Sequence, residues 1–277
     1  LSRGLGDVYK RQFVDPRGRV FAKHEGEAPA EALEAFCRQA LADYRAEGLI
    51  DTSRPLPLRI ESEATGQLAF PGKLAVDGER LAIADTNHDR VLVASAAGEV
   101  RAVYDGFTRP QGVCFDGDAL HVADTGAHAL RSVDLGSGET RLLGDGLRSP
   151  WDVAVAGGDL YVAMAGTHQV WRARGRELAP FAGSGREGIQ DGAPDVAWLA
   201  QPSGLASASG RLYVADSEVS GVREISLPGG EVRTLVGTGL FDFGDRDGPA
   251  AAALLQHPLA VAAGDGCVYI ADSYNHK

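Results

Sequence analysis

The sequence predicts a mainly β protein, a β-propeller preceded by a short α/β segment. One strand pattern, Leu-x-Val-Ala-Asp or a close variant, recurs five times along the chain. The copies begin at Leu81, Leu120, Leu160, Leu212 and Val268. A proline opens each unit, and successive prolines are 39, 40, 52 and 56 residues apart. Four short strand patterns per unit match the size and content of a propeller blade, and radial stacking gives nearly identical units nearly identical neighbours.

The start of the chain fits no repeat. Residues 1–12 match neither neighbouring pattern, and we interpret them as a non-native adaptor scar. Residues 13–50 predict a hairpin with its turn at 16–18, then a helix from Ala30 to Glu47 that ends before Gly48. Cys37 falls on the apolar face of this helix, so we expect it in a core. A hairpin and one helix cannot bury a stable core, which indicates the tail of a larger domain.

A linker separates this tail from the repeats. Residues 51–67 are rich in proline and polar residues, and they contain the strand-like segment 58–61. Residues 68–277 hold the repeats and stop after the second strand of the fifth unit. We therefore expect about four and a half blades and a chain truncated at both ends, which also begins without methionine.

The repeated aspartates end the second strand of their blades. They are Asp85, Asp124, Asp216 and Asp272. We expect each carboxylate to accept N–H groups of the following turn and to pair with a cation such as Arg90 or Arg131. Met164 takes the place of Asp in the third unit, which favours this local structural role over a ring of metal ligands.

The repeats resemble NHL repeats. The matching residues are Val-Ala-Asp-Thr-Gly at 122–126, Ile-Ala-Asp-Thr at 83–86 and Ile-Ala-Asp-Ser-Tyr-Asn-His-Lys at 270–277. The resemblance implies a six-bladed ring, in which 58–61 would complete the final blade. Residues 13–48 resemble the end of a thioredoxin-like domain. Together with two Gly-x-Gly…Asp-Gly inserts, at 183–192 and 237–248, these features resemble the thioredoxin-like/NHL-repeat-containing proteins.

Composition excludes several classes of partner. The net charge of −11 and the pI near 5.1 argue against a nucleic-acid backbone as partner. No apolar run approaches the ~18 residues that cross a bilayer, so we expect no membrane partner. The three cysteines are far apart, which argues against a disulfide framework and a zinc knuckle. Unpaired cysteines and the family resemblance favour a cytoplasmic location.

Three further motifs are better explained by turns than by ligands. Gly183–Gly188 matches Gly-x-Gly-x-x-Gly but does not join a strand to a helix, so dinucleotide binding is not expected. Residues 245–248 imitate part of a calcium loop, without its first ligand or its closing Glu. His128, His168 and His276 recur at equivalent loop positions, which a propeller keeps too far apart to share one metal ion. We expect no cofactor.

The face on which the inner strands begin is the remaining candidate binding surface. We expect the second residue after each proline to face the central funnel. The candidate ligand-binding residues are Lys73, Arg109, Trp151, Asp152, Gln201 and His257. They contain no catalytic triad, so we predict a non-catalytic module that binds a protein or small ligand. The resemblance implies that any thiol–disulfide chemistry belongs to an upstream redox domain. The alternative is a metal-dependent propeller enzyme of the lactonase or lyase type.

Overall fold

The computed structural model describes residues 11–24, 30–51, 66–175 and 177–277. The chain divides into two compact units, Leu1–Glu63 and Ala64–Lys277. Each unit is described by itself. The predicted strand at 58–61 lies outside the described residues. No helix among the described ones is long and apolar enough to cross a membrane.

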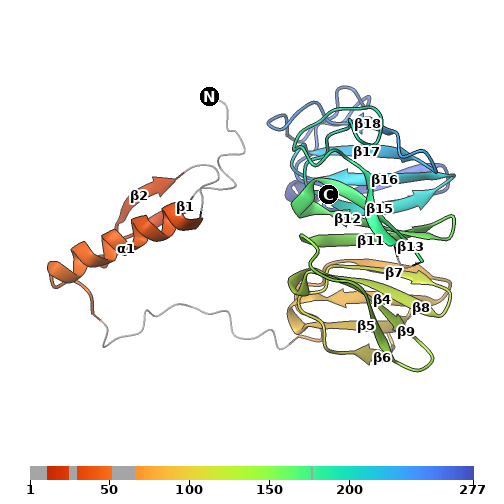
Figure 1. Cartoon of the computed structure of the whole chain (residues 1–277), viewed down its shortest axis with the longest axis horizontal. Coiled ribbons are helices and arrows are strands. Elements are labelled where there is room, and N and C mark those ends of the chain that lie inside the picture. The colour runs from red at the N-terminus through yellow and green to blue at the C-terminus, as the bar shows by residue number, and fades with distance from the viewer. Residues whose placement is uncertain (1–10, 25–29, 52–65, 176) are drawn as a thin grey trace. The chain divides into compact units, whose positions relative to one another are not determined.

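The first unit is a hairpin followed by a helix. Strands β1 (Arg11–Val14) and β2 (Val20–His24) pair antiparallel, and α1 spans Ala30–Ala46 (Figure 1). Gly48 follows the helix with a φ of +68°, as expected of a left-handed helix end. Two details differ from the sequence prediction. Residues 11 and 12 belong to β1, although we assigned them to a non-native scar, and Cys37 is exposed in this unit.

Aromatic side chains hold the helix against the hairpin. The Phe36 ring lies 4.7 Å from Phe13 and 5.9 Å from Phe21, and Tyr44 lies 5.6 Å from Phe21 (centroid distances). Both Phe21 and Phe36 nevertheless remain 40% exposed. The apolar face of this unit is therefore only partly covered by its own residues.

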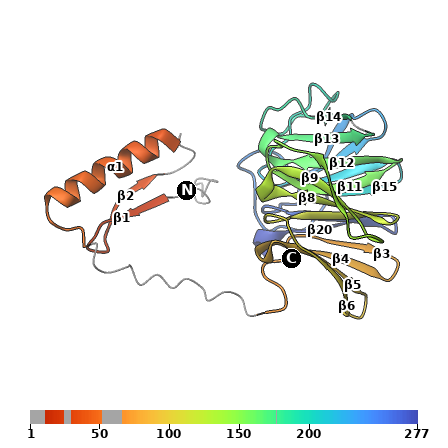
Figure 2. The same ribbon diagram turned by 60° about the horizontal axis from the view of Figure 1, so that its bottom comes forward.

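The second unit is a β-propeller with four complete blades and half of a fifth. Each complete blade is a four-stranded antiparallel sheet in chain order from the inner to the outer strand (Figures 1 and 2). Blade 1 contains β3 (Leu74–Asp77), β4 (Arg80–Asp85), β5 (Arg90–Ser95) and β6 (Val100–Tyr104). Blade 2 contains β7 (Gly112–Asp116), β8 (Ala119–Asp124), β9 (Ala129–Asp134) and β10 (Thr140–Gly144). Blade 3 contains β11 (Pro150–Ala156), β12 (Asp159–Met164), β13 (Gln169–Arg174) and β14 (Glu177–Ala182). Blade 4 contains β15 (Pro202–Ala208), β16 (Arg211–Asp216), β17 (Gly221–Ser226) and β18 (Val232–Val236), and the half blade contains β19 (Ala260–Gly264) and β20 (Cys267–Ala271).

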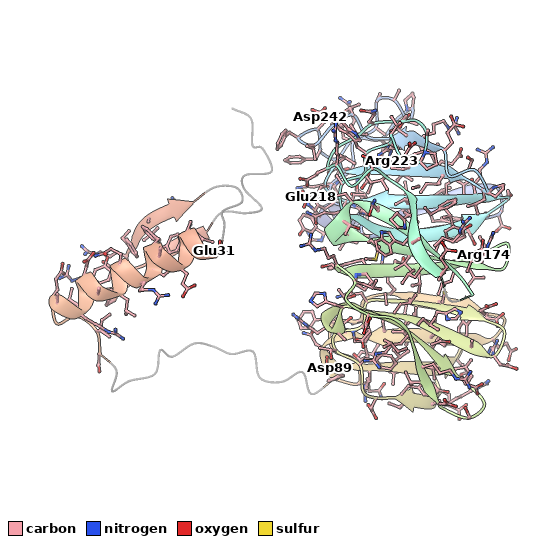
Figure 3. The ribbon with its side chains drawn as sticks, viewed as in Figure 1. Glu31, Asp89, Arg174, Glu218, Arg223 and Asp242 are labelled. Atoms are coloured by element: carbon pink, nitrogen blue, oxygen red, sulfur yellow. The ribbon has the colours of Figure 1, made fainter. Side chains whose placement is uncertain are left out.

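Short 3₁₀ turns follow the second strand of four blades. They are η2 (Thr86–His88), η3 (Thr125–Ala127), η4 (Ala165–Thr167) and η5 (Ser273–Asn275). Figure 3 shows Asp89 and Glu218, which follow second strands, on one face of the propeller, and Arg174, in a strand-end hairpin, on the opposite face. We call the first the loop face and the second the hairpin face.

The core lies between consecutive blades. Separate clusters of buried apolar side chains join blades 1 and 2, 2 and 3, 3 and 4, and 4 and 5. Second-strand residues such as Leu120, Val122, Val162, Leu212 and Val214 are completely buried, because these strands are flanked by others and covered on both faces. Burying one such side chain contributes roughly 1.5–3 kcal/mol. The prediction of a β-propeller with about four and a half blades present is confirmed.

Candidate functional site

The inner strands converge where they begin, on the loop face. The residue before each opening proline has a left-handed backbone, with φ of 47°, 46°, 50°, 60° and 46° in chain order. These residues are Phe70, Arg109, Ser149, Gln201 and His257. A non-glycine residue with positive φ is uncommon, and a following proline restricts the backbone further. The same sharp turn into the inner strand is therefore built five times.

Side chains of the preceding blade hold three of these turns. The N–H of Arg109 donates to Asp89 Oδ1 at 2.7 Å, and that of Gln201 to His168 Nδ1 at 3.2 Å. The N–H of His257 lies 3.3 Å from Ser220 Oγ. The backbone of these three candidate residues thus takes part in joining one blade to the next.

Lys73 and Asp152 meet at the axis. Lys73 Nζ lies 3.6 Å from Asp152 Oδ2 and also donates to the carbonyl of Leu259. Asp152 accepts the N–H of Leu205 at 2.8 Å and that of Val153 at 2.9 Å. Both charged side chains are only 8% exposed. This group of contacts, which we call the axial polar cluster, joins blades 1, 3 and 4 and the half blade.

Burial changes the pKa of both charged residues of the axial polar cluster. Removal from water lowers the pKa of Lys73, and the Asp152 carboxylate opposes this change. Burial likewise raises the pKa of Asp152, while Lys73 and two backbone N–H groups act in the opposite direction. Each charge is therefore stable in this position only because the other one is present.

Glycine permits the close approach of the inner strands. A Cβ atom on Gly112 would lie 2.5 Å from Asp152 Cα, and one on Gly204 would lie 2.8 Å from Ala260 Cα. Real Cβ atoms do not approach other atoms this closely. Four of the five positions that we predicted to face the funnel thus lie where neighbouring inner strands approach closely, and Gly112, Gly204 and Ala260 carry no side chain or only a methyl group.

A cavity of about 960 Å³ runs along the inner strands. Lys73 and Asp152 line it together with small and apolar residues of all five inner strands, among them Ala75, Ala154, Ala206 and Ala262. Cys114 also lines it, and burial raises the pKa of this thiol well above its usual value. Of the six candidate ligand-binding residues, only Lys73 and Asp152 line this cavity. Trp151 is half-buried beside it, and Arg109, Gln201 and His257 belong to the turns above.

The repeated aspartates hold the loop that enters their own blade. In four blades, the carboxylate accepts a backbone N–H from the residue 16 positions earlier, at 2.7 Å. The donor and acceptor pairs are Ala69 and Asp85, Thr108 and Asp124, Ala200 and Asp216, and Gln256 and Asp272. This corrects our expectation that the following turn supplies the donor, since Asp85, Asp124 and Asp272 make no side-chain cap bond there.

The second oxygen of these carboxylates takes a side-chain partner. Asp85 pairs with Arg90 at 2.8 Å, Asp124 with Arg131 at 2.7 Å and Asp216 with Arg223 at 3.1 Å. In the half blade, Asn275 Nδ2 donates to Asp272 Oδ2 at 2.7 Å. Burial raises the pKa of Asp124 despite its partners, and it raises the pKa of Asp216 to about 6.

The residue after the aspartate joins its blade to the next one. Thr86 Oγ1 donates to the carbonyl of Pro110 at 2.8 Å, Thr125 Oγ1 to Pro150 at 2.6 Å and Ser217 Oγ to Pro258 at 2.8 Å. We call these bonds the hydroxyl staples. Blade 3 carries Met164 and Ala165 at the two positions, so it has neither the carboxylate nor the staple.

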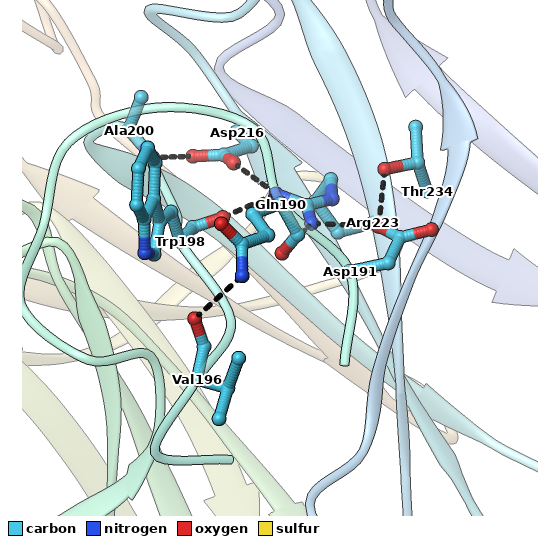
Figure 4. Close-up of polar contacts among 8 residues, drawn as sticks. All are labelled: Gln190, Asp191, Val196, Trp198, Ala200, Asp216, Arg223 and Thr234. Carbon is cyan, nitrogen blue, oxygen red and sulfur yellow. Dashed lines mark hydrogen bonds and ion pairs between the residues drawn. The ribbon is translucent and has the colours of Figure 1, made fainter. Parts of the chain in front are cut away.

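Arg223 is a site residue that the sequence did not single out. It is completely buried, and Nη1 donates to the Trp198 carbonyl at 2.7 Å and reaches Asp216. Its Nη2 donates to the Gln190 carbonyl at 3.0 Å and to Asp191 Oδ1 at 2.9 Å (Figure 4). The first insert begins with the motif at 183–192 and runs to residue 201, just before the opening proline of blade 4, and Arg223 therefore fastens it to that blade. Two signals in the sequence point to such an anchor: Arg223 follows Asp216 by seven residues, as Arg131 follows Asp124, and the spacing from Asp191 to Pro202 is repeated from Asp247 to Pro258.

The repeated histidines have a conformational role. His128, His168 and His276 end 3₁₀ turns with φ of 54°, 54° and 59°, a left-handed region in which histidine is enriched. Asp89 and Ser220 adopt the same conformation at the equivalent positions. Within the described ranges, no three His, Cys, Asp or Glu side chains are placed to hold one metal ion.

Comparisons with known proteins agree with this architecture. A model of the NHL repeat matches residues 147–172, which include the first two strands of blade 3. NHL repeat-containing protein 2 of Gallus gallus is 38% identical over 332 residues, covering 96% of this chain and 46% of that protein. Its counterpart in Homo sapiens is 37% identical with the same coverage. SUPPRESSOR OF QUENCHING 1, chloroplastic, of Arabidopsis thaliana is 37% identical over 95% of this chain and 30% of that protein.

Solved structures show the same fold at low identity. A structural genomics protein of unknown function from Bacteroides thetaiotaomicron superposes with a TM-score of 0.65 at 20% identity, over 74% of this chain and 57% of the other. An auxiliary nutrient binding protein from Bacteroides ovatus gives 0.64 at 19% identity, over 76% and 58%. The chain spans less than half the length of the curated relatives that it matches. It carries an NHL repeat within a β-propeller, and it is similar over nearly its whole length to NHL repeat-containing protein 2.

Proposed function

We propose that the propeller is a non-catalytic module that binds a protein or a small ligand. The observation that carries this proposal is the cavity of about 960 Å³ along the inner strands. It combines apolar walls with one buried ion pair at the axis, and concave sites with a few placed polar groups are typical of ligand pockets.

A substitution that fills the cavity tests this proposal. Ala262 lines the cavity and is exposed, so Ala262→Trp adds volume without overpacking the core. Ala97→Trp places the same side chain in an exposed turn and serves as the control. We expect native mass spectrometry of the protein purified from its own cells to show a bound molecule that Ala97→Trp retains and Ala262→Trp loses. Equal occupancy in both variants, or no bound molecule in the unmodified protein, would overturn the proposal.

We further propose that the first unit ends a thioredoxin-like domain, and that the whole protein carries out thiol–disulfide exchange with cysteines outside this chain. The partly exposed aromatic face of α1 and the hairpin supports the first part, because further residues of a larger domain would cover it. The long relatives, of which this chain spans 30–46%, provide room for such a domain.

An insulin-reduction assay of the whole protein tests the redox proposal. We expect activity to depend on an upstream Cys-x-x-Cys pair and to survive Cys37→Ser, Cys114→Ser and Cys267→Ser. The Cys114 thiol is half-buried and its pKa is raised, which makes it a poor nucleophile. An inactive whole protein, or activity that depends on these three cysteines, would contradict the proposal.

A further inference from the structure

The two inserts share one backbone pairing but carry different side chains on it. In the first insert, Gln190 and Trp198 exchange backbone hydrogen bonds of 3.4 and 3.0 Å. In the second insert, residues 237–257, Arg246 and Leu254 do the same at 3.2 and 2.9 Å. A Cβ atom on Gly188 would lie 3.0 Å from the Trp198 ring, and one on Gly244 would lie 3.1 Å from Leu254. Trp198 and Leu254 therefore occupy equivalent positions.

The first insert carries a pit that contains the tryptophan. The pit has a volume of about 480 Å³ and is lined by Ser184, Arg186, Gln190, Asp195, Val196 and Trp198. We call it the Trp198 pit. Arg223 holds the backbone on both sides of it, because its guanidinium donates to the carbonyls of Gln190 and Trp198 (Figure 4). The pit is thus built on a rigid support rather than on a free loop.

The polar side chains of the pit, apart from Arg186, present hydrogen-bond acceptors. Asp195 offers an exposed carboxylate. Gln190 Nε2 donates to the carbonyl of Val196 at 3.4 Å, which leaves Oε1 of the same amide as an acceptor. The hydroxyl oxygen of Ser184 is buried and has no hydrogen-bond partner in the described part of the chain. Unpartnered buried hydroxyl groups are uncommon in native proteins, and one at a pit indicates a group that arrives from outside.

One occupant satisfies both the acceptors and the indole. A guanidinium group is planar, carries five N–H donors around its edge and stacks on aromatic faces. Arg186 shows that this geometry fits, because its Cζ atom lies 5.6 Å from the centre of the Trp198 ring. Arg186 is exposed, and among the described contacts it makes no ion pair. The chain as a whole carries a charge of −11, which attracts a basic partner.

We propose that the Trp198 pit binds an arginine side chain of a basic partner peptide, and that Arg186 occupies the face of Trp198 until the partner replaces it. This site lies on an insert between blades and is independent of the axial cavity. Displacement exchanges one cation–π contact for another, so the gain comes from the acceptors that Arg186 leaves unused.

A titration of the full chain with acetyl-Gly-Gly-Arg-Gly-Gly amide tests the proposal. We expect a saturable shift of the Trp198 indole N–H signal in ¹H–¹⁵N spectra. The same peptide with lysine should bind several-fold more weakly, because an ammonium group offers neither the planar edge nor the stacking face. Trp198→Leu copies the second insert and has no indole signal, so its binding is followed by the backbone N–H signals of the pit residues. It should abolish the peptide-induced shifts of these signals while leaving the net charge and thermal unfolding unchanged.

Arg186 gives the sharpest test. Arg186→Ala should strengthen binding of the arginine peptide several-fold, because the competing side chain is gone. Arg101→Ala, which removes an equally charged and exposed side chain from β6, should increase affinity far less. Equal effects of the two variants would show that net charge alone governs binding and would overturn the proposal. So would equal affinity for the lysine peptide, or unchanged binding by Trp198→Leu.

Discussion

Arg223 Nη1 lies 3.1 Å from Asp216 Oδ2, and both side chains are completely buried. We expect Arg223→Met to lower the free energy of unfolding by about 3–5 kcal/mol, because the buried Asp216 carboxylate and the carbonyls of Gln190 and Trp198 lose their cation at a place that water does not reach. Urea denaturation measures the change. Arg131→Met is the matched control: Arg131 pairs through Nε with the equally buried Asp124, but its own side chain is 29% exposed, so water can take the place of the lost guanidinium. A cost for Arg131→Met as large as that for Arg223→Met would contradict this prediction.

The missing hydroxyl staple of blade 3 can be restored. Ala165 occupies the position at which Thr86, Thr125 and Ser217 donate to the proline carbonyl of the next blade. We expect Ala165→Ser to raise the free energy of unfolding by about 0.5–1.5 kcal/mol, the usual net value of one hydrogen bond. Thr86→Val should lower it by a similar amount. Thermal unfolding of both variants checks the pair, and a destabilised Ala165→Ser would show that this junction is arranged differently.

Gly112 is required because the inner strands of blades 2 and 3 lie too close together for a side chain, and not because of its backbone conformation. Gly112→Ala would place a Cβ atom 2.5 Å from the backbone of Asp152, so the inner strands of blades 2 and 3 must separate. Overpacking of this kind costs about 1–3 kcal/mol or more. Gly264→Ala is the control, because a Cβ atom there meets nothing within 4 Å. Differential scanning calorimetry should show a lower melting temperature for Gly112→Ala alone.

His121 should make the propeller sensitive to acid. Burial lowers its pKa below the ordinary value of 6.5, although Asp116, 3.7 Å away, opposes this change, and its Nδ1 is buried without a partner in the described residues. Below pH 6.5 the unfolded chain binds a proton that the folded chain does not. The free energy of unfolding therefore falls as the pH drops from 6.5 through the lowered pKa of the folded state.

Urea denaturation at pH 7.5, 6.0 and 5.0 measures this dependence. His121→Gln should lose stability less steeply over this range than the unmodified protein. His276→Asn removes an exposed histidine and should leave the slope unchanged. The prediction fails if both variants retain the full acid dependence.

The fold could be predicted because its evidence is local and repeated. The Leu-x-Val-Ala-Asp strand and the opening proline each appear in every blade, with Met164 the one departure from the aspartate. The donors to the repeated aspartates could not be predicted, because each lies 16 residues earlier, before the inner strand of the blade. The sequence predicted that Lys73 and Asp152 both face the central funnel, because they occupy equivalent positions of their blades. Their contact could not be predicted, since it depends on how the blades are arranged in space.

Arg223 shows a second limit of sequence reasoning. A lone arginine in a strand pattern indicates an exposed side chain, since arginine is seldom fully buried. Four acceptors from three separate segments surround its guanidinium, and no local pattern reports such a convergence. Likewise, we expected Cys37 in a hydrophobic core. It is exposed because the hairpin and α1 of the first unit supply only part of such a core.

The axial polar cluster affects how the blades unfold. Repeat proteins usually behave as chains of nearest neighbours, in which end units can fray while the middle persists. Lys73 instead bonds to Asp152 of blade 3 and to Leu259, at the start of the half blade, neither of which adjoins its own blade in sequence. Melting of the first blade therefore removes a contact from the middle and from the far end at once. The blades should accordingly unfold together in a single cooperative transition instead of in steps from either end.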